Sequence, residues 1–310
     1  MAILPTAPEF APSNYIMNIA TPPFFLIRTR VSEKEWRFDG SDEAWAATEE
    51  FDGILEKSHA TGKMGGSLRS FLKRYPWHFD ALSHYSGEKL REGKTLEAYA
   101  FSHAAVATAR NCIPSEFDPA LHYIPGGFVE NRPFLRCLYN LMQCYEALGD
   151  YRGASALGNE LLQFDYEDRM GARMEMPKYF LRQGRYQAAD ELFSAEKWES
   201  TFYAAQHLYP VVLLHLGRRD EAIEEIENLL GRPNIARYLL DPEAPCPPQD
   251  SPFGMSSGSD LEGYYFASQY AYYWATCPEA LGLLFEATRK VEAVGWPRYF
   301  DTSGAGKHLK

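Results

Sequence analysis

The stretch LYNLMQCYEALGDYRGA, residues 138–154, carries two amphipathic helical patterns joined at Gly149. Leu141 and Tyr145 lie four residues apart, which places both on one face of a helix. Gly149 can adopt the left-handed conformation that ends a helix. Ala154, five residues later, leaves room for the next helix to cross closely. The stretch therefore predicts a helical hairpin.

The same glycine–alanine spacing occurs at three further places in the chain. The four pairs are Gly93 with Ala98, Gly149 with Ala154, Gly184 with Ala189, and Gly217 with Ala222. The glycines are separated by 56, 35 and 33 residues, and the last two intervals approach the period of about 34 that helical-hairpin repeats show. This pattern predicts an all-α, right-handed solenoid of about five or six hairpins.

The hairpins resemble the tetratricopeptide repeat (TPR) family. The motifs that carry the resemblance are Leu138-x2-Leu141-Met142-x2-Tyr145-x3-Gly149-x-Tyr151-x2-Ala154, Phe180-x3-Gly184-x-Tyr186-x2-Ala189 and Leu213-x3-Gly217-x4-Ala222. Residues 130–290 also resemble the repeat region of suppressor-of-tumorigenicity-type proteins and bacterial relatives, which implies a scaffold or adaptor. Two features depart from the TPR pattern. Lys89 stands where a bulky apolar residue is expected, and Pro177 and Pro210 fall inside first helices, which predicts kinks or late helix starts.

The domain organisation follows from where the repeat pattern holds. Residues 1–40 are predicted to form an irregular arm with one strand-like piece at residues 24–31. Residues 41–310 are predicted to form a single TPR-like solenoid, with insertions at about 112–133 and 231–260. The second insertion holds six prolines, so we expect neither insertion to be helical throughout.

Composition limits the classes of function. With 310 residues, 45% of them hydrophobic, the chain can bury a large core. A net charge of -11 argues against a nucleic-acid partner, because phosphate neutralisation needs clustered cations. Five cysteines without a CxxC pair favour a reducing compartment. No secretory signal or membrane span is visible. We therefore expect a cytoplasmic or nuclear protein, and its oligomeric state does not follow from the residues.

The enzyme signals in the sequence are weak. Gly93-Lys94-Thr95 resembles the end of a phosphate-binding loop, but Glu88 stands where the first glycine is needed. The eight histidines form no HExxH motif or close pair with cysteine. The sequence thus predicts no catalytic residue, no metal and no cofactor. An enzyme or small-molecule-binding protein with a pocket near the aromatic helix 264–274 is the alternative, and that helix can equally belong to the core or to a partner groove.

The resemblance to TPR proteins implies a binding groove lined by the first helices of successive hairpins. The predicted groove residues are Arg136, Tyr139, Gln143, Lys178, Arg182, His207, His215, Tyr265, Gln269, Tyr272 and Tyr273. Arginine and tyrosine dominate the hot spots of protein interfaces, so the partner is expected to be a protein or a peptide.

The cations in the middle of this groove predict an acidic or carboxylate-ended peptide as the partner. The alternative is an ordinary solvated surface, or an internal ion pair of Arg136 or Lys178 with Glu146 or Glu175. The carboxylate clamp of the chaperone-binding TPR proteins is not reproduced. Its places hold Ser83, Gly87, Tyr139 and Gln143.

Overall fold

The computed structural model describes residues 22–61, 64–194, 207–231, 233–249, 256 and 258–294. The chain divides into two compact units, Met1–Ala172 and Arg173–Lys310, which we call unit 1 and unit 2. Each unit is described by itself. The prediction that residues 41–310 form one continuous solenoid therefore stays a prediction.

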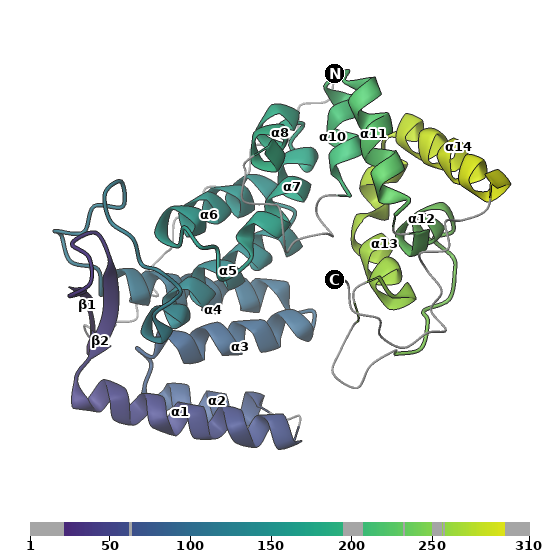
Figure 1. The fold of residues 1–310 in the computed structure, drawn as a ribbon. Coiled ribbons are helices and arrows are strands. Elements are labelled where there is room, and N and C mark those ends of the chain that lie inside the picture. The colour runs from purple at the N-terminus through teal and green to yellow at the C-terminus, as the bar shows by residue number, and fades with distance from the viewer. Residues whose placement is uncertain are drawn as a thin grey trace, which may run out of the picture. The chain divides into compact units, whose positions relative to one another are not determined.

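Unit 1 is a stack of helices with a short sheet (Figure 1). Its helices are α1 (Asp42–Thr61), α2 (Gly65–Arg74), α3 (Phe79–Arg91), α4 (Thr95–Arg110), the 3-10 turn η1 (Val129–Asn131), α5 (Arg132–Ala147) and α6 (Tyr151–Phe164). Helices α3 and α4 form one hairpin and α5 and α6 form the next, and α5 packs on both α3 and α4. Helix α2 contacts α1 and α3.

The arm predicted at residues 1–40 is more regular than expected where the structure describes it. Strand β1 (Phe24–Arg28) lies inside the predicted strand-like piece and pairs antiparallel with β2 (Trp36–Gly40), which the sequence reading missed. Phe24, Leu26, Trp36 and Phe38 are buried, because alternate residues of a strand face one side. Residues 1–21 of the arm lie outside the described residues.

Unit 2 contains the later hairpins of the chain. Its helices are α7 (Ala172–Arg182), α8 (Tyr186–Ser194), α10 (Tyr209–His215), α11 (Arg219–Leu229), α12 (Pro233–Leu240), α13 (Asp260–Ala275) and α14 (Pro278–Val294). Helix α12 falls inside the insertion predicted at 231–260 and packs on α13. Helix α10 begins at Tyr209, so the late helix start predicted at Pro210 is confirmed. Helix α7 begins at Ala172 and contains Pro177, so no late helix start occurs at that proline.

The four turn glycines have the conformation that the sequence predicts. Gly93, Gly149, Gly184 and Gly217 have φ angles of 74°, 77°, 67° and 76°. At the second turn the N–H of Asp150 donates to the carbonyl oxygen of Tyr145 at 2.9 Å, and equivalent bonds close the other three turns. This is the Schellman arrangement, which satisfies the last carbonyls of a helix. The four paired alanines are fully buried, so the predicted TPR-like helical-hairpin fold is confirmed.

Lys89 departs from the TPR pattern without breaking the first hairpin. Its side chain is buried along the helix, with Nζ 5.0 Å from the centroid of the Tyr85 ring and 2.8 Å from Glu92 Oε2. A lysine can bury its aliphatic stem while its charged end finds a partner. The stem of Lys89 therefore fills the space that a bulky apolar residue occupies in other hairpins.

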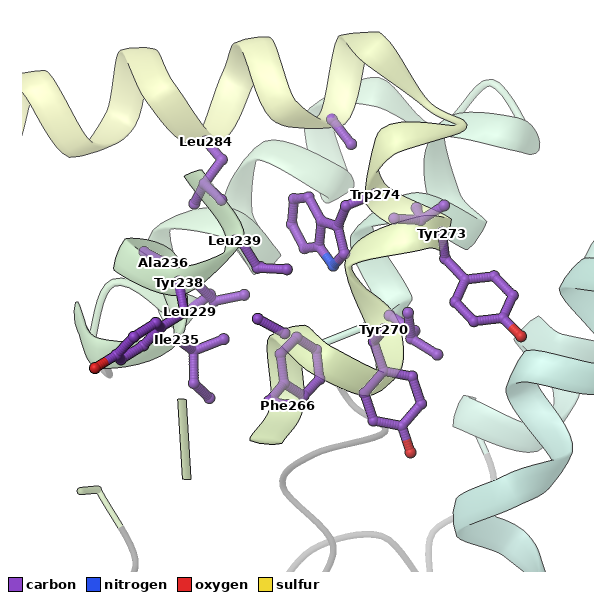
Figure 2. Close-up of a cluster of buried hydrophobic side chains, with 14 of the residues drawn as sticks. Leu229, Ile235, Ala236, Tyr238, Leu239, Phe266, Tyr270, Tyr273, Trp274 and Leu284 are labelled. Atoms are coloured by element: carbon purple, nitrogen blue, oxygen red, sulfur yellow. The ribbon is translucent and has the colours of Figure 1, made fainter. Parts of the chain in front are cut away.

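The aromatic helix 264–274 contributes mainly to the core of unit 2. Phe266, Tyr270, Tyr273 and Trp274 of α13 pack with side chains of α12 and α14 in one buried cluster (Figure 2). Aromatic side chains bury large areas, so this cluster contributes strongly to stability. The interpretation of these four residues as core is confirmed.

Candidate functional site

Unit 1 contains a cleft with a volume of about 330 Å³, formed by the two strands, α1, the start of α3 and the start of α5. We call it the N-terminal cleft. Its aromatic wall consists of Phe24, Phe38, Trp45 and Phe79. Its charged groups are Asp52, Asp80, Glu130, Arg132 and Arg136. Of the predicted groove residues, Arg136 is the one that lines this cleft.

The aromatic wall is assembled from both strands and two helices. The ring centroid of Phe79, at the start of α3, lies 5.1 Å from that of Phe24 and 5.7 Å from that of Phe38. Trp45 of α1 meets Phe24 edge-on at 6.3 Å. Aromatic rings at these separations attract one another beyond simple burial. The wall is therefore a closely packed apolar surface.

Asn131 fixes the strands against the start of α5. Its Oδ1 accepts a hydrogen bond from the N–H of Phe38 at 2.9 Å. Its Nδ2 donates to the carbonyl oxygens of Trp36 at 3.0 Å and Pro125 at 2.9 Å. The side chain is fully buried. Because one amide satisfies three backbone groups, it holds the aromatic wall in register with α5.

Arg136 is engaged inside the protein. Its Nη1 lies 2.5 Å from Asp80 Oδ1 and 3.3 Å from His84 Nε2, across the contact between α5 and α3. Arg136 therefore forms an internal ion pair, which is the alternative that the sequence left open. Its partner is Asp80 and not the expected Glu146 or Glu175. A carboxylate at this distance offsets much of the charge of the guanidinium.

His78 lies at the bottom of the cleft as the N-cap of α3. Its Nδ1 accepts a hydrogen bond from the N–H of Ala81 at 3.2 Å, so the proton of the neutral ring is on Nε2. Nε2 lies 3.3 Å from Thr48 Oγ1, which donates to the carbonyl oxygen of Ala44 at 2.9 Å. Burial lowers the pKa of His78 from 6.5 to about 4, although the charge of Asp80 acts in the opposite direction.

This depressed pKa predicts a loss of stability in mild acid. The unfolded chain binds a proton at His78 below pH 6.5 and the folded chain only near pH 4, so stability falls between these values. We expect the free energy of unfolding to drop by about 2 kcal/mol from pH 7 to pH 5 through this group. His78→Asn keeps a side-chain acceptor for the N-cap and removes the titration. Urea unfolding of both proteins at the two pH values measures the difference, and equal pH dependence would contradict the assignment.

Tyr139 and Gln143 lie on α5 of unit 1 and are half-buried. The remaining predicted groove residues lie in unit 2. On α7, Lys178 Nζ is 2.5 Å from Glu175 Oε2, which is one of the two internal ion pairs that the sequence left open. The predicted groove draws its residues from both units, so it stays a prediction.

Helices α7 and α13 bring several of the predicted groove residues together in unit 2. The Arg182 guanidinium lies 3.8 Å from the centroid of the Tyr272 ring and 5.6 Å from that of Tyr273. Tyr265 and Tyr272 are 48% and 52% exposed, and Gln269 is exposed on the same helix. Tyr273, by contrast, is buried in the core cluster.

The two predicted histidines make ring contacts. His215 at the end of α10 stacks on Tyr186, with centroids 4.2 Å apart and planes 10° from parallel. His207 meets Phe266 edge-on at 5.4 Å. In the part of the chain that the structure describes, no group of three or more His, Cys, Asp or Glu could hold a metal ion. No helix there is long and apolar enough to cross a membrane.

Comparison with known proteins shows the family. The model of a family described as "Transcriptional repressor TCF25" matches residues 36–292, which cover both units. The chain belongs to the Tcf25 family. The resemblance to TPR proteins identified the type of repeat, whereas the narrower resemblance of residues 130–290 to suppressor-of-tumorigenicity-type proteins did not identify the family, which is Tcf25.

Solved structures similar to this Tcf25-family chain include two crystal structures whose description is "Podosopora anserina putative kinesin light chain nearly identical TPR-like repeats". Both are 17% identical to this chain and cover 71% of it and 97% of their own length, with TM-scores of 0.41 and 0.39. No curated protein matches the chain significantly.

Proposed function

We propose that this Tcf25-family chain is a protein-interaction scaffold without catalytic activity, and that it binds a segment of a partner protein in a transcription-related role. The family description supports the transcription-related part and, with it, a nuclear location. The observation that carries the scaffold proposal is the N-terminal cleft. Binding sites combine an apolar surface with a few polar groups on rigid elements. The cleft has this composition and a volume of about 330 Å³, which suits one or two side chains of a protein segment.

The structure weakens the case for an acidic or carboxylate-ended partner. That prediction rested on Arg136, Lys178 and Arg182. The first two lie 2.5 Å from Asp80 and Glu175, and the third lies 3.8 Å from the centroid of the Tyr272 ring. These contacts supply interactions that an acidic ligand would otherwise provide. We therefore base the proposed function on the cleft.

Site-specific photo-crosslinking in cells tests the scaffold proposal. Val129 lines the mouth of the cleft and is 62% exposed, so p-benzoylphenylalanine at this position does not disturb the core. Val31 in the turn between the strands is 81% exposed and serves as the matched control position. We expect irradiation to link a peptide of a second protein to position 129 and not to position 31, as read by mass spectrometry.

Two results would overturn the proposal in different ways. Equal crosslinking at both positions would show that the cleft does not select the partner. A chain that links to no second protein at position 129, with its unfolding midpoint unchanged, would show that the cleft is not an interaction site.

A further inference from the structure

We infer that the N-terminal cleft accepts a lysine or arginine side chain of the partner segment, with Asp52 as its carboxylate partner and Trp45 and Phe24 beside its aliphatic stem. This inference rests on the proposed function and names the chemistry of the bound side chain. It also reverses the charge that the sequence predicts for the ligand.

The first argument is the charge balance of the cleft. Asp52, Asp80 and Glu130 face Arg132 and Arg136. The Arg136 guanidinium is held by Asp80 at 2.5 Å, and Glu130 pairs with Arg37 at 3.3 Å. Arg132 is exposed, and its Nε donates to the carbonyl oxygen of Gly126 at 3.1 Å. Once these contacts are formed, Asp52 is the carboxylate of the cleft for which the described residues provide no ion pair.

The second argument is the state of the Asp52 carboxyl group. Asp52 is exposed, and its pKa is nevertheless raised, first by partial desolvation and then by the negative charges of Asp80 and Glu56, although Arg136 acts in the opposite direction. A carboxylate in this situation is stabilised by a nearby cation, because the cation offsets both the desolvation and the repulsion. The site therefore favours a cationic ligand over a neutral or anionic one.

The third argument is the aromatic wall. Trp45 is half-buried and Phe24 lies against it, and both line the same cleft as Asp52, so the cleft offers an apolar aromatic surface as well as a carboxylate. Lysine and arginine carry an aliphatic stem that packs on apolar surface and a charged end that stays near polar groups. Their cations are also attracted to the faces of aromatic rings. An aspartate or glutamate side chain would gain neither interaction.

NMR titration of the intact chain tests this inference with defined probes. The probes are the N-acetyl methylamides of lysine, norleucine and glutamate, which share one backbone and differ in side-chain charge. The reporter is the indole N–H cross-peak of Trp45, assigned from its loss in Trp45→Phe. We expect the lysine probe alone to give a saturable shift, and Asp52→Asn to weaken its binding about fivefold, as for one partly exposed ion pair.

Glu49→Gln is the matched control, because it removes one negative charge from an exposed position of α1 that lies outside the cleft lining and is not among the charges that raise the pKa of Asp52. We expect it to change the affinity of the lysine probe less than twofold. If both variants weakened the binding of the lysine probe equally, the net charge of α1 alone would explain the binding, and the inference would be overturned. Tighter binding of the glutamate probe, equal binding of norleucine, or no saturable shift with lysine would overturn it as well. If a partner still crosslinks at position 129 in any of these cases, the proposed function stands and only the cationic side chain is rejected.

Discussion

Asn131→Asp is expected to lower the free energy of unfolding of unit 1 by about 4 kcal/mol. The amide Nδ2 donates to the carbonyl oxygens of Trp36 and Pro125 at 3.0 and 2.9 Å, and aspartate has no donor to offer them. The substitution therefore removes the side-chain donor from both carbonyls, leaves Pro125 with only the N–H of Phe128 at 3.3 Å, and places a carboxylate oxygen against both carbonyl oxygens. Hydrogen exchange followed by mass spectrometry measures this loss as faster exchange of the backbone amides in residues 24–40, which contain both strands.

Asn140→Asp is the matched control for this prediction. Asn140 lies on α5, the helix that begins directly after Asn131, and its Nδ2 donates to the carbonyl oxygen and Oγ of Ser83 at 3.1 and 2.8 Å. It is only half-buried, so water can replace the lost partners, and we expect a cost of about 1 kcal/mol. If Asn131→Asp cost no more than Asn140→Asp, the amide would not be what holds the strands to α5.

The hairpins could be predicted from the sequence because their signal is local. A glycine that ends one helix and an alanine five residues later both belong to one short turn. Each of the four turns requires a positive φ angle at its glycine, as observed. Strand β2, with the sequence WRFDG, was missed although Trp36 and Phe38 alternate as strand residues do. The signal was short, and Asp39 and Gly40 are residue types that strands disfavour.

Helix α12 was not predicted, because the six prolines of residues 231–260 make the segment as a whole unlike a helix. Pro233 is the first residue of α12, where proline suits a helix, and the other five prolines stand after Leu240. The position of each proline relative to the amphipathic segment NIARYLL, residues 234–240, could have identified the helix. The number of prolines in a segment is therefore a weaker signal than their places.

The N-terminal cleft could not be predicted from local patterns. Its lining comes from two strands, α1, α3, η1 and α5, and the pair of Arg136 with Asp80 joins residues 56 positions apart. The repeat phase correctly singled out Arg136 as a residue on a first helix. It carried no information about the carboxylate opposite, because that contact depends on how two hairpins stack.

Gly263→Ala is expected to lower the free energy of unfolding of unit 2 by about 2 to 3 kcal/mol. A Cβ atom at Gly263 on α13 would lie 2.7 Å from the carbonyl oxygen of Asn234 and 2.8 Å from its carbonyl carbon. Both are backbone atoms of α12, so they cannot turn aside as a flexible side chain would. The two helices would have to separate, which loosens the contact of Ile235 with the buried cluster around Trp274 (Figure 2).

Gly282→Ala provides the matched comparison, because a Cβ atom at Gly282 on α14 meets nothing within 4 Å. There the exchange of glycine for alanine acts only on the backbone, and we expect a gain of about 0.5 to 1 kcal/mol. The same substitution thus changes the free energy of unfolding in opposite directions in two helices of one unit. At Gly263 the steric cost exceeds the gain in helix propensity. Urea unfolding followed by tryptophan fluorescence measures both. A stabilising Gly263→Ala would mean that α12 does not pack on α13 at this distance, and the core cluster would then need a different arrangement of its helices.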